Sequence, residues 1–343
     1  MRKHLNTLYV TTQGAYLAKD GESILVRVEG RPKARVPAHN LAGIVCFGNV
    51  SFSPFLLGHC SERGILVSFL TQRGRFLARI HGKVSGNVLL RREQYRRADD
   101  EDACAAIARN VVVAKSANCR LSLLRARRDR PDSPGGPAVE AAAAELSRCL
   151  RQVQRERSVE SIRGVEGAAA RAYFGVFRYL ITQQVDSFAF TGRSRRPPLD
   201  RINALLSFVY TLLVHDVTSA LEGVGLDPAV GFLHRDRPGR PSLALDMMEE
   251  LRPYVADRLS LALVNLRTLN PDHFNVEESG AVLLTEDGRM VVLRAYQKRK
   301  DEELTHPFLG EKVTVGMLPH LQALLLARHL RGDLDAYPPF LAR

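Results

Sequence analysis

The chain contains 343 residues, of which 45% are hydrophobic and 25% charged, and this length is enough for two domains with cores of their own. Its formal net charge of +12 favours polyanionic partners such as DNA or RNA. The longest apolar run, residues 204–214, is far shorter than the roughly 20 residues of a membrane-spanning helix, and the first residues lack the apolar stretch of a signal peptide. Five singly scattered cysteines argue against a disulfide framework, so we expect a cytoplasmic protein without a membrane partner.

The first 85 residues have the short β-rich runs and turn signals of a small β-sandwich. Hairpin turns are indicated at Asp20-Gly21 and Arg73-Gly74. A short helix is predicted over residues 54–62. The expected strands are 8–12, 15–19, 23–28, 43–47, 65–69 and 75–81.

From about residue 86 the hydrophobic period becomes helical. Pro253 is expected to end or kink the sixth helix, and residues 282–292 are expected to form a small hairpin around Asp287-Gly288. The sequence therefore predicts an α+β protein, with an N-terminal β-sandwich domain (1–85) followed by a larger all-α C-terminal domain (86–343). The expected helices are 89–94, 102–127, 139–154, 158–180, 200–221, 242–270 and 315–330.

One segment combines a histidine with acidic residues on a predicted helix. His234 precedes a helix that is expected to start at Ser242 and to carry Asp246 and Glu249. Imidazole and carboxylate together suit Mn²⁺ or Mg²⁺, and the arginines that surround them suit phosphate. A solvated acidic face beside a structural histidine is the alternative. The surrounding arginines are Arg235, Arg237, Arg240 and Arg252.

A second segment places a single carboxylate among small residues. Glu166 is flanked by glycines, and on a helix it shares a face with Ala169, Ala170 and Tyr173. Such small neighbours leave room for a metal ion with its phosphate. A tight helix crossing with Glu166 at its rim is the alternative.

Arginines and tyrosines near these segments are candidate nucleic-acid contacts, because guanidinium groups bind phosphate and the net charge is high. Any one arginine cluster fits a solvated face equally well, and either tyrosine fits a core position. The sequence contains no phosphate-binding P-loop and no nucleophile elbow, so a nucleotide-hydrolysing motor and a serine hydrolase are not supported. The candidates are Tyr173, Arg193, Arg195, Arg196, Tyr210, Arg235, Arg237 and Arg240.

Four motifs in a fixed order carry a family resemblance. They are Ile-Arg-Gly-Val-Glu-Gly (162–167), Arg-Arg-Pro-Pro-Leu-Asp-Arg-Ile-Asn-Ala-Leu-Leu-Ser-Phe-Val-Tyr (195–210), Gly-Leu-Asp-Pro-Ala-Val-Gly-Phe-Leu-His (225–234) and Arg-Pro-Ser-Leu-Ala-Leu-Asp-Met-Met-Glu-Glu (240–250). With the β-rich N-terminal domain before them, the chain resembles the CRISPR-associated adaptation integrases, the "Cas one" family, and within it the type I-C branch.

The resemblance implies a dimerising N-terminal β-domain and a helical catalytic domain with a Mn²⁺ or Mg²⁺ site. The family's metal-binding glutamate and histidine fall on Glu166 and His234. The family's second acid falls on Asp246 or Glu249. We favour Glu249, which lies in the Met-Glu-Glu that closes the motif, with Asp246 as an accessory acid. We also expect carboxylate repulsion in the metal-free protein, so that removing Glu166 or Glu249 leaves its stability unchanged or raised.

The activity implied by the resemblance is that of a metal-dependent DNA endonuclease and integrase. It joins the 3′-hydroxyl ends of captured double-stranded DNA fragments into CRISPR repeat DNA by transesterification. Homodimers of such proteins work with a small partner of the "Cas two" family, in some systems together with a trimming nuclease. Two other classes remain open: a general metal-dependent nuclease on branched or single-stranded nucleic acid, and a non-catalytic DNA-binding scaffold.

Overall fold

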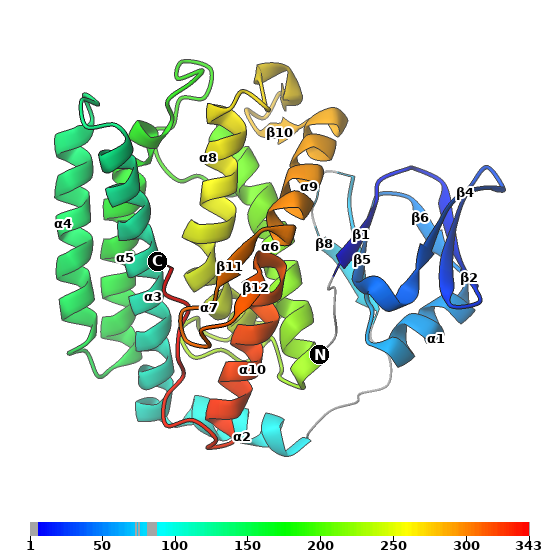
Figure 1. The fold of residues 1–343 in the computed structure, drawn as a ribbon, viewed down its shortest axis with the longest axis horizontal. Helices are drawn as coiled ribbons and strands as arrows, with labels where there is room; N and C mark the ends of the chain where they lie inside the picture. Colours follow the sequence, from blue (N-terminus) through cyan, green and yellow to red (C-terminus); the bar gives the residue numbers. More distant parts are fainter. Residues whose placement is uncertain (1–5, 73, 75, 81–87, 343) are drawn as a thin grey trace. The chain divides into compact units, whose positions relative to one another are not determined.

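Figure 1 shows a computed structural model of the chain, which describes residues 6–72, 74, 76–80 and 88–342. The chain divides into two compact units, Met1–Gly86 and Asn87–Arg343. In its described part the first unit is made of strands with one short α-helix, and the second is mainly helical, so the α+β class predicted from the sequence is confirmed. The dimerising role of the first unit stays a prediction.

The N-terminal unit consists of two four-stranded sheets that share one core. Leu17, Ile24 and Ile44 are fully buried between them, together with Leu56 from the helix α1 (Pro54–Arg63). β1, β5 and β7 run parallel and β8 is antiparallel to β7, whereas β3 is antiparallel to both β2 and β4, and β6 is parallel to β2. The strand order of the first sheet is β1 (Asn6–Val10), β5 (Leu41–Phe47), β7 (Leu66–Leu70), β8 (Phe76–Ile80). The strand order of the second sheet is β4 (Arg31–Pro37), β3 (Ser23–Val28), β2 (Ala15–Asp20), β6 (Val50–Phe52).

The first unit contains two strands that the sequence did not predict. β4 lies at a sheet edge, where prolines and exposed charged residues are tolerated, so it lacks the apolar alternation of a strand with one buried face. β6 has only three residues. The other expected strands and the helix are confirmed in this unit, although Arg73, Arg75 and His81 of the expected last hairpin lie outside the described residues.

The C-terminal unit is built around two long helices. α3 packs against α4, α5 and α7, and α6 packs against α7 and α10 (Figure 1). The helices of the described part of this unit are α2 (Val88–Asp99), α3 (Glu101–Asp129), α4 (Gly136–Val153), α5 (Val159–Val176), α6 (Arg201–Val224), α7 (Ser242–Leu251), α8 (Arg258–Asn265), α9 (Glu286–Asp301) and α10 (Leu318–Leu330).

Three predictions for this unit need correction or refinement. The unit is not all-α, because β9 (Phe274–Val276) pairs with β10 (Val282–Leu284) and β11 (Glu303–Thr305) pairs with β12 (Lys312–Thr314). The hairpin expected around Asp287-Gly288 is wrong: these residues form the first turn of α9, because the hydroxyl of Thr285 accepts a hydrogen bond from the Gly288 N–H and caps the helix. The predicted sixth helix changes at Pro253, as expected, where a π-turn separates α7 from α8.

α6 is the one described helix that is long and apolar enough to cross a membrane by length and composition. It has 24 residues, and 72% of its most apolar window is buried inside the unit. Such burial is that of a core helix, which explains the length of its apolar stretch.

Candidate active site

Three charged side chains from three helices meet inside the C-terminal unit. Lys115 on α3 lies between Glu166 on α5 and Glu249 on α7. Its ammonium group is 2.7 Å from Glu249 Oε2 and is also paired with Glu166 Oε1. The side chains of Lys115 and Glu249 are 8% and 3% exposed, whereas that of Glu166 is 26% exposed. The cluster is therefore buried on one side and reaches solvent at Glu166.

Arg252, in the π-turn after α7, is a second cation that pairs with Glu249. Its Nη1 lies 2.6 Å from Glu249 Oε1, and its guanidinium covers the ring of Tyr210 at 4.8 Å. Burial opposes the ionisation of Glu249, but the charges of Arg252 and Lys115 outweigh it and lower the pKa of this carboxyl to about 2. Burial likewise opposes the charge of Lys115, and Glu249 and Glu166 outweigh it and raise the pKa of the amine. Glu249, Lys115 and Arg252 are therefore charged at neutral pH.

His234 is held in one orientation by Asp246. Its Nδ1 is 2.6 Å from Asp246 Oδ1, and its backbone N–H donates to the same oxygen at 2.9 Å. Asp246 Oδ2 accepts the backbone N–H groups of Phe232 and Leu233 at 2.6 and 2.8 Å. The carboxylate of Asp246 is thus fully engaged, and the other ring nitrogen of His234, Nε2, is left 3.9 Å from Glu249 Oε1.

Gly231 makes this close approach possible. A Cβ atom at this position would lie 2.8 Å from Asp246 Oδ2 and 2.8 Å from the carbonyl carbon of Ser242. Any side chain would therefore push the carboxylate of Asp246 out of the loop that carries His234. Gly231, the second glycine of the third sequence motif, therefore leaves the space that the carboxylate of Asp246 occupies.

The two glycines beside Glu166 have open space around them, whereas Ala169 and Tyr173 on its own helix face are buried in the packing of α5. A Cβ atom built on Gly164 would meet nothing within 4 Å, and one on Gly167 would meet only Arg171 Nη1 at 3.6 Å. Small residues beside Glu166 therefore leave space on the solvent side of α5. Both alternatives from the sequence describe part of this segment: Glu166 lies at the rim of a packed helix face, and the glycines beside it are open.

The donor set of Glu166, His234 and Glu249 suits a hard or borderline divalent cation. Among the described residues, no three His, Cys, Asp or Glu side chains are arranged to hold one ion as they stand, since Lys115 lies between the two glutamates. Glu249 Oε2 is buried and pairs with the Lys115 ammonium at 2.7 Å, so this carboxylate already accommodates a positive charge. An imidazole fixed through Nδ1, with Nε2 free, is also the usual state of a metal-binding histidine. These features fit a metal ion held by Glu166, His234 and Glu249, with Asp246 orienting the histidine.

The arginines among the predicted nucleic-acid contacts differ in exposure. Arg195, Arg196 and Arg237 are exposed, and Arg235 is exposed but paired with Glu160 at 2.8 Å. Arg240 is half-buried. The exposed arginines remain available to phosphate.

Arg193 and the two predicted tyrosines lie inside the unit. Arg193 donates to Asn203 Oδ1 at 2.6 Å, and its guanidinium covers the Tyr210 ring at 5.2 Å. The hydroxyl of Tyr210 donates to the buried Asp257 at 2.6 Å. Tyr173 is 1% exposed, so it occupies a core position, which is the alternative that the sequence left open for it.

Sequence reasoning did not find Lys115. A signal was present, because Lys115 is the lone lysine in the alanine- and valine-rich segment 103–119, where a charge needs a buried partner. Arg252 was counted as a phosphate ligand, whereas here it is paired with Glu249. Both assignments depend on contacts between helices that no spacing in the sequence encodes.

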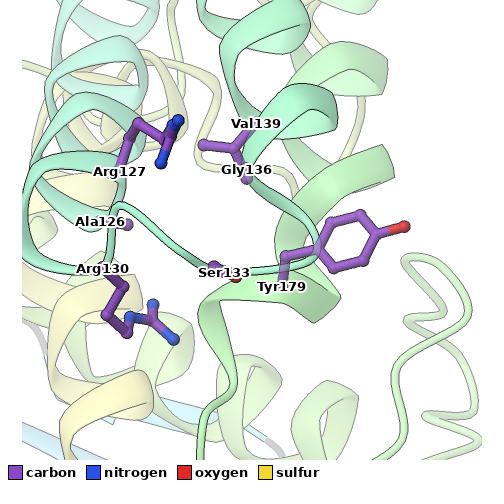
Figure 2. A pocket seen from close by; sticks show the side chains of 7 residues that line it. All are labelled: Ala126, Arg127, Arg130, Ser133, Gly136, Val139 and Tyr179. Carbon is purple, nitrogen blue, oxygen red and sulfur yellow. The ribbon is translucent and has the colours of Figure 1, made fainter.

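A shallow pocket at the far end of α3 does not belong to this cluster. Figure 2 shows the side chains that line it around the loop between α3 and α4. Arg127, one of its two arginines, is already paired with Glu140 at 2.8 Å. The lining residues are Ala126, Arg127, Arg130, Ser133, Gly136, Val139 and Tyr179.

Comparisons with known proteins agree with this architecture. A protein-family model described as CRISPR associated protein Cas1 matches residues 8–298. The chain is 56% identical over 343 residues, 100% of both chains, to a Chlorobaculum tepidum protein named CRISPR-associated endonuclease Cas1 1. It is 37% identical over 339 residues to a Geobacter sulfurreducens protein named CRISPR-associated exonuclease Cas4/endonuclease Cas1 fusion, covering 98% of this chain and 60% of that protein. A solved CAS1 protein from Thermotoga maritima superposes with a TM-score of 0.80 and 26% identity, covering 96% of this chain and 97% of that one.

Proposed function

Because this chain belongs to the Cas1 family of CRISPR-associated proteins, we propose that it is a metal-dependent DNA endonuclease and integrase of CRISPR adaptation. The observation that supports the proposal is that Glu166 and Glu249 are both paired with the buried Lys115, while His234 Nε2 lies 3.9 Å from Glu249 Oε1. Its substrates are double-stranded DNA fragments with free 3′-hydroxyls and the repeat DNA of a CRISPR array.

The reaction is a transesterification at phosphorus. The 3′-hydroxyl oxygen of the fragment forms a new P–O bond, and the P–O bond to the 3′-oxygen of the repeat strand breaks. The proton lost by the attacking hydroxyl is balanced by the proton gained by the leaving 3′-oxygen. One phosphodiester replaces another, so no nucleotide triphosphate is needed, in keeping with the lack of a P-loop in the sequence.

Glu166, His234 and Glu249 would hold Mn²⁺ or Mg²⁺, which supplies Lewis-acid polarisation of the phosphoryl oxygen and of the attacking or leaving oxygen. Asp246 keeps the imidazole of His234 in the tautomer and orientation that leave Nε2 free as a ligand. Lys115 and Arg252 bring two buried positive charges to the site, where they would stabilise the negative charge that builds on the phosphoryl group.

The partners follow from the family and from its relatives. The relative that fuses a Cas4 exonuclease to a Cas1 endonuclease supports a separate trimming nuclease as a partner of this chain. A homodimer formed through the N-terminal unit, a small Cas2 partner and a type I-C-like system complete the proposal. Exposed arginines such as Arg195, Arg196 and Arg237 would bind the DNA backbone, and a cytoplasmic location follows from that substrate.

A strand-joining assay tests the proposal. The purified protein is mixed with Mn²⁺, its small partner, a short DNA duplex and a supercoiled plasmid that bears the repeat. We expect joined products that disappear in chelator and in Glu166→Ala. A duplex with 3′-dideoxy ends is the matched control, because it can be bound but cannot attack.

Each alternative function gives a different result in this assay. A general nuclease cuts the plasmid equally well with hydroxyl or dideoxy fragments and joins neither. A DNA-binding scaffold retains all activity of the assembly in Glu166→Ala. Either result would refute the integrase assignment.

A further inference from the structure

The segment after α10 contacts α3 and α7, two of the three helices that carry the candidate site. In Figure 1 its trace runs from the end of α10 back to the side of α3. Tyr337 and Phe340 within it are 1% and 0% exposed, although the segment has no regular secondary structure. We call residues 337–342 the strap. They lie beyond residue 298, where the match to the family model ends.

The strap is tied to α7 through Glu250, the residue next to Glu249. The hydroxyl of Tyr337 donates to Glu250 Oε1, and the backbone N–H of Phe340 donates to Glu250 Oε2 at 2.6 Å. Gln322 on α10 donates to Glu250 Oε2 at 3.2 Å and to the Tyr337 hydroxyl at 2.6 Å. Glu250 is fully buried, so these donors replace the water that its carboxylate would otherwise bind.

The strap is tied to α3 through Asn118. The side-chain amide of Asn118 donates to the carbonyls of Phe340 at 2.9 Å and of Glu250 at 2.7 Å. Its Oδ1 accepts the backbone N–H of Ala342 at 2.9 Å. One buried asparagine therefore joins α3, α7 and the strap.

These contacts lie directly behind the candidate site. Asn118 is three residues after Lys115 on α3, and Glu250 follows Glu249 on α7. α7 has only 10 residues and runs into a π-turn at Arg252, where the regular α-helical hydrogen-bond pattern ends. The strap supplies tertiary hydrogen bonds at the turn where α7 presents Glu249.

We propose that the strap is a positioning element of the active site, which fastens α7 to α3 and so fixes Glu249 relative to Glu166 and His234. Tyr337 and Asn118 act through Glu250 and touch neither metal nor DNA. The inference rests on the proposed function, because its effect is on metal binding by Glu249.

The test compares two tyrosines in the full-length chain. Tyr337→Phe removes the hydroxyl bonded to Glu250, and Tyr296→Phe removes an equally buried hydroxyl that donates to Asp216 at 3.0 Å on another side of the unit. Both variants keep the buried ring. Mn²⁺ affinity is measured by electron paramagnetic resonance, together with kcat and KM for strand joining.

In Tyr337→Phe we expect Mn²⁺ binding to weaken roughly tenfold, the low end of the effect of removing a partner behind a metal ligand. kcat should fall while KM for DNA is unchanged, and Tyr296→Phe should match the wild type in all three quantities. A Tyr337→Phe protein with wild-type Mn²⁺ affinity would refute the positioning role of the strap and leave the proposed function intact. A wild-type protein that binds no Mn²⁺ would overturn the metal assignment of the proposed function and the strap with it.

A second measurement needs no variant. If the strap favours metal binding, metal binding must stabilise the strap by the same free energy, because linkage is reciprocal. Mn²⁺ should therefore slow hydrogen exchange at the amides of Phe340 and Ala342 in the wild-type protein. Unchanged exchange at both amides in saturating Mn²⁺ would also contradict the proposal.

Discussion

Replacing Glu249 with alanine should destabilise the metal-free protein, contrary to the expectation from sequence. Two acids at one metal site suggested mutual repulsion, which a substitution would relieve. In the structure Glu249 is instead bound by two buried cations, Lys115 at 2.7 Å and Arg252 at 2.6 Å. Its removal leaves Arg252 without this partner and Lys115 with Glu166 only.

The size of the effect follows from the burial of these groups. Breaking a buried ion pair from one side costs about 3–5 kcal/mol, and we take about 3 because Lys115 keeps Glu166. For a unit of this size that loss lowers the Tm by roughly 6–12 °C. The low pKa of Glu249 places the effect on the pH scale: its stabilisation is fully present above the unfolded value of 4.5 and is lost as pH falls toward about 2. A measurement at pH 7 therefore records the whole contribution.

The assay is urea denaturation at pH 7 in excess chelator, followed by circular dichroism. Glu166→Ala is the control, because it removes the other acidic partner of Lys115. We expect the free energy of unfolding to fall by only about 1 kcal/mol, because Glu166 is partly exposed and Lys115 keeps its pair with Glu249. A Glu249→Ala protein as stable as the wild type, or more stable, would refute the view that the metal-free site is held together by its cations.

Asp246→Ala should weaken Mn²⁺ binding roughly 10- to 100-fold in a titration and also lower the urea midpoint, because it leaves three backbone N–H groups and the ring of His234 without their acceptor; unchanged binding would mean that His234 needs no support. Burial raises the pKa of Asp257 to about 6, so its contribution to stability is present below the unfolded value of 3.8 and is lost as pH rises through 6. Asp257→Asn should therefore flatten the pH dependence of the unfolding free energy in that window, and a curve parallel to the wild type would contradict this. DNA affinity should fall steeply between about 50 and 200 mM salt, and Arg195→Ala with Arg196→Ala should reduce that slope; an unaltered slope would place the DNA elsewhere.

Local signals in the sequence were enough for most of the secondary structure and for the family. Alternation and hairpin turns predicted the inner strands of the first unit, and helical periodicity with cap residues predicted the long helices. These signals failed where the local environment departs from the usual case. β4 is an exposed edge strand, and Asp287-Gly288 begins a helix because Thr285 precedes it as a cap.

The sequence also supplied the residues of the candidate site, since Glu166, His234, Asp246 and Glu249 lie in ordered motifs. The preference for Glu249 over Asp246 as the ligand rested on the family motif and not on local geometry. Asp246 and Glu249 are three residues apart on one helix and project in similar directions. What separates them in space is the loop of residues 232–234, whose N–H groups engage Asp246 and leave Glu249 to face Lys115.

Only the tertiary structure decided which charges meet. Lys115, Glu166 and Glu249 come from three helices, and the strap joins residue 118 to residues 250 and 340. A sequence records side-chain chemistry and local periodicity, which act over a few residues. The balance of charge in a buried site depends on groups brought together from distant parts of the chain, because Coulomb energy depends on distance in space and on burial.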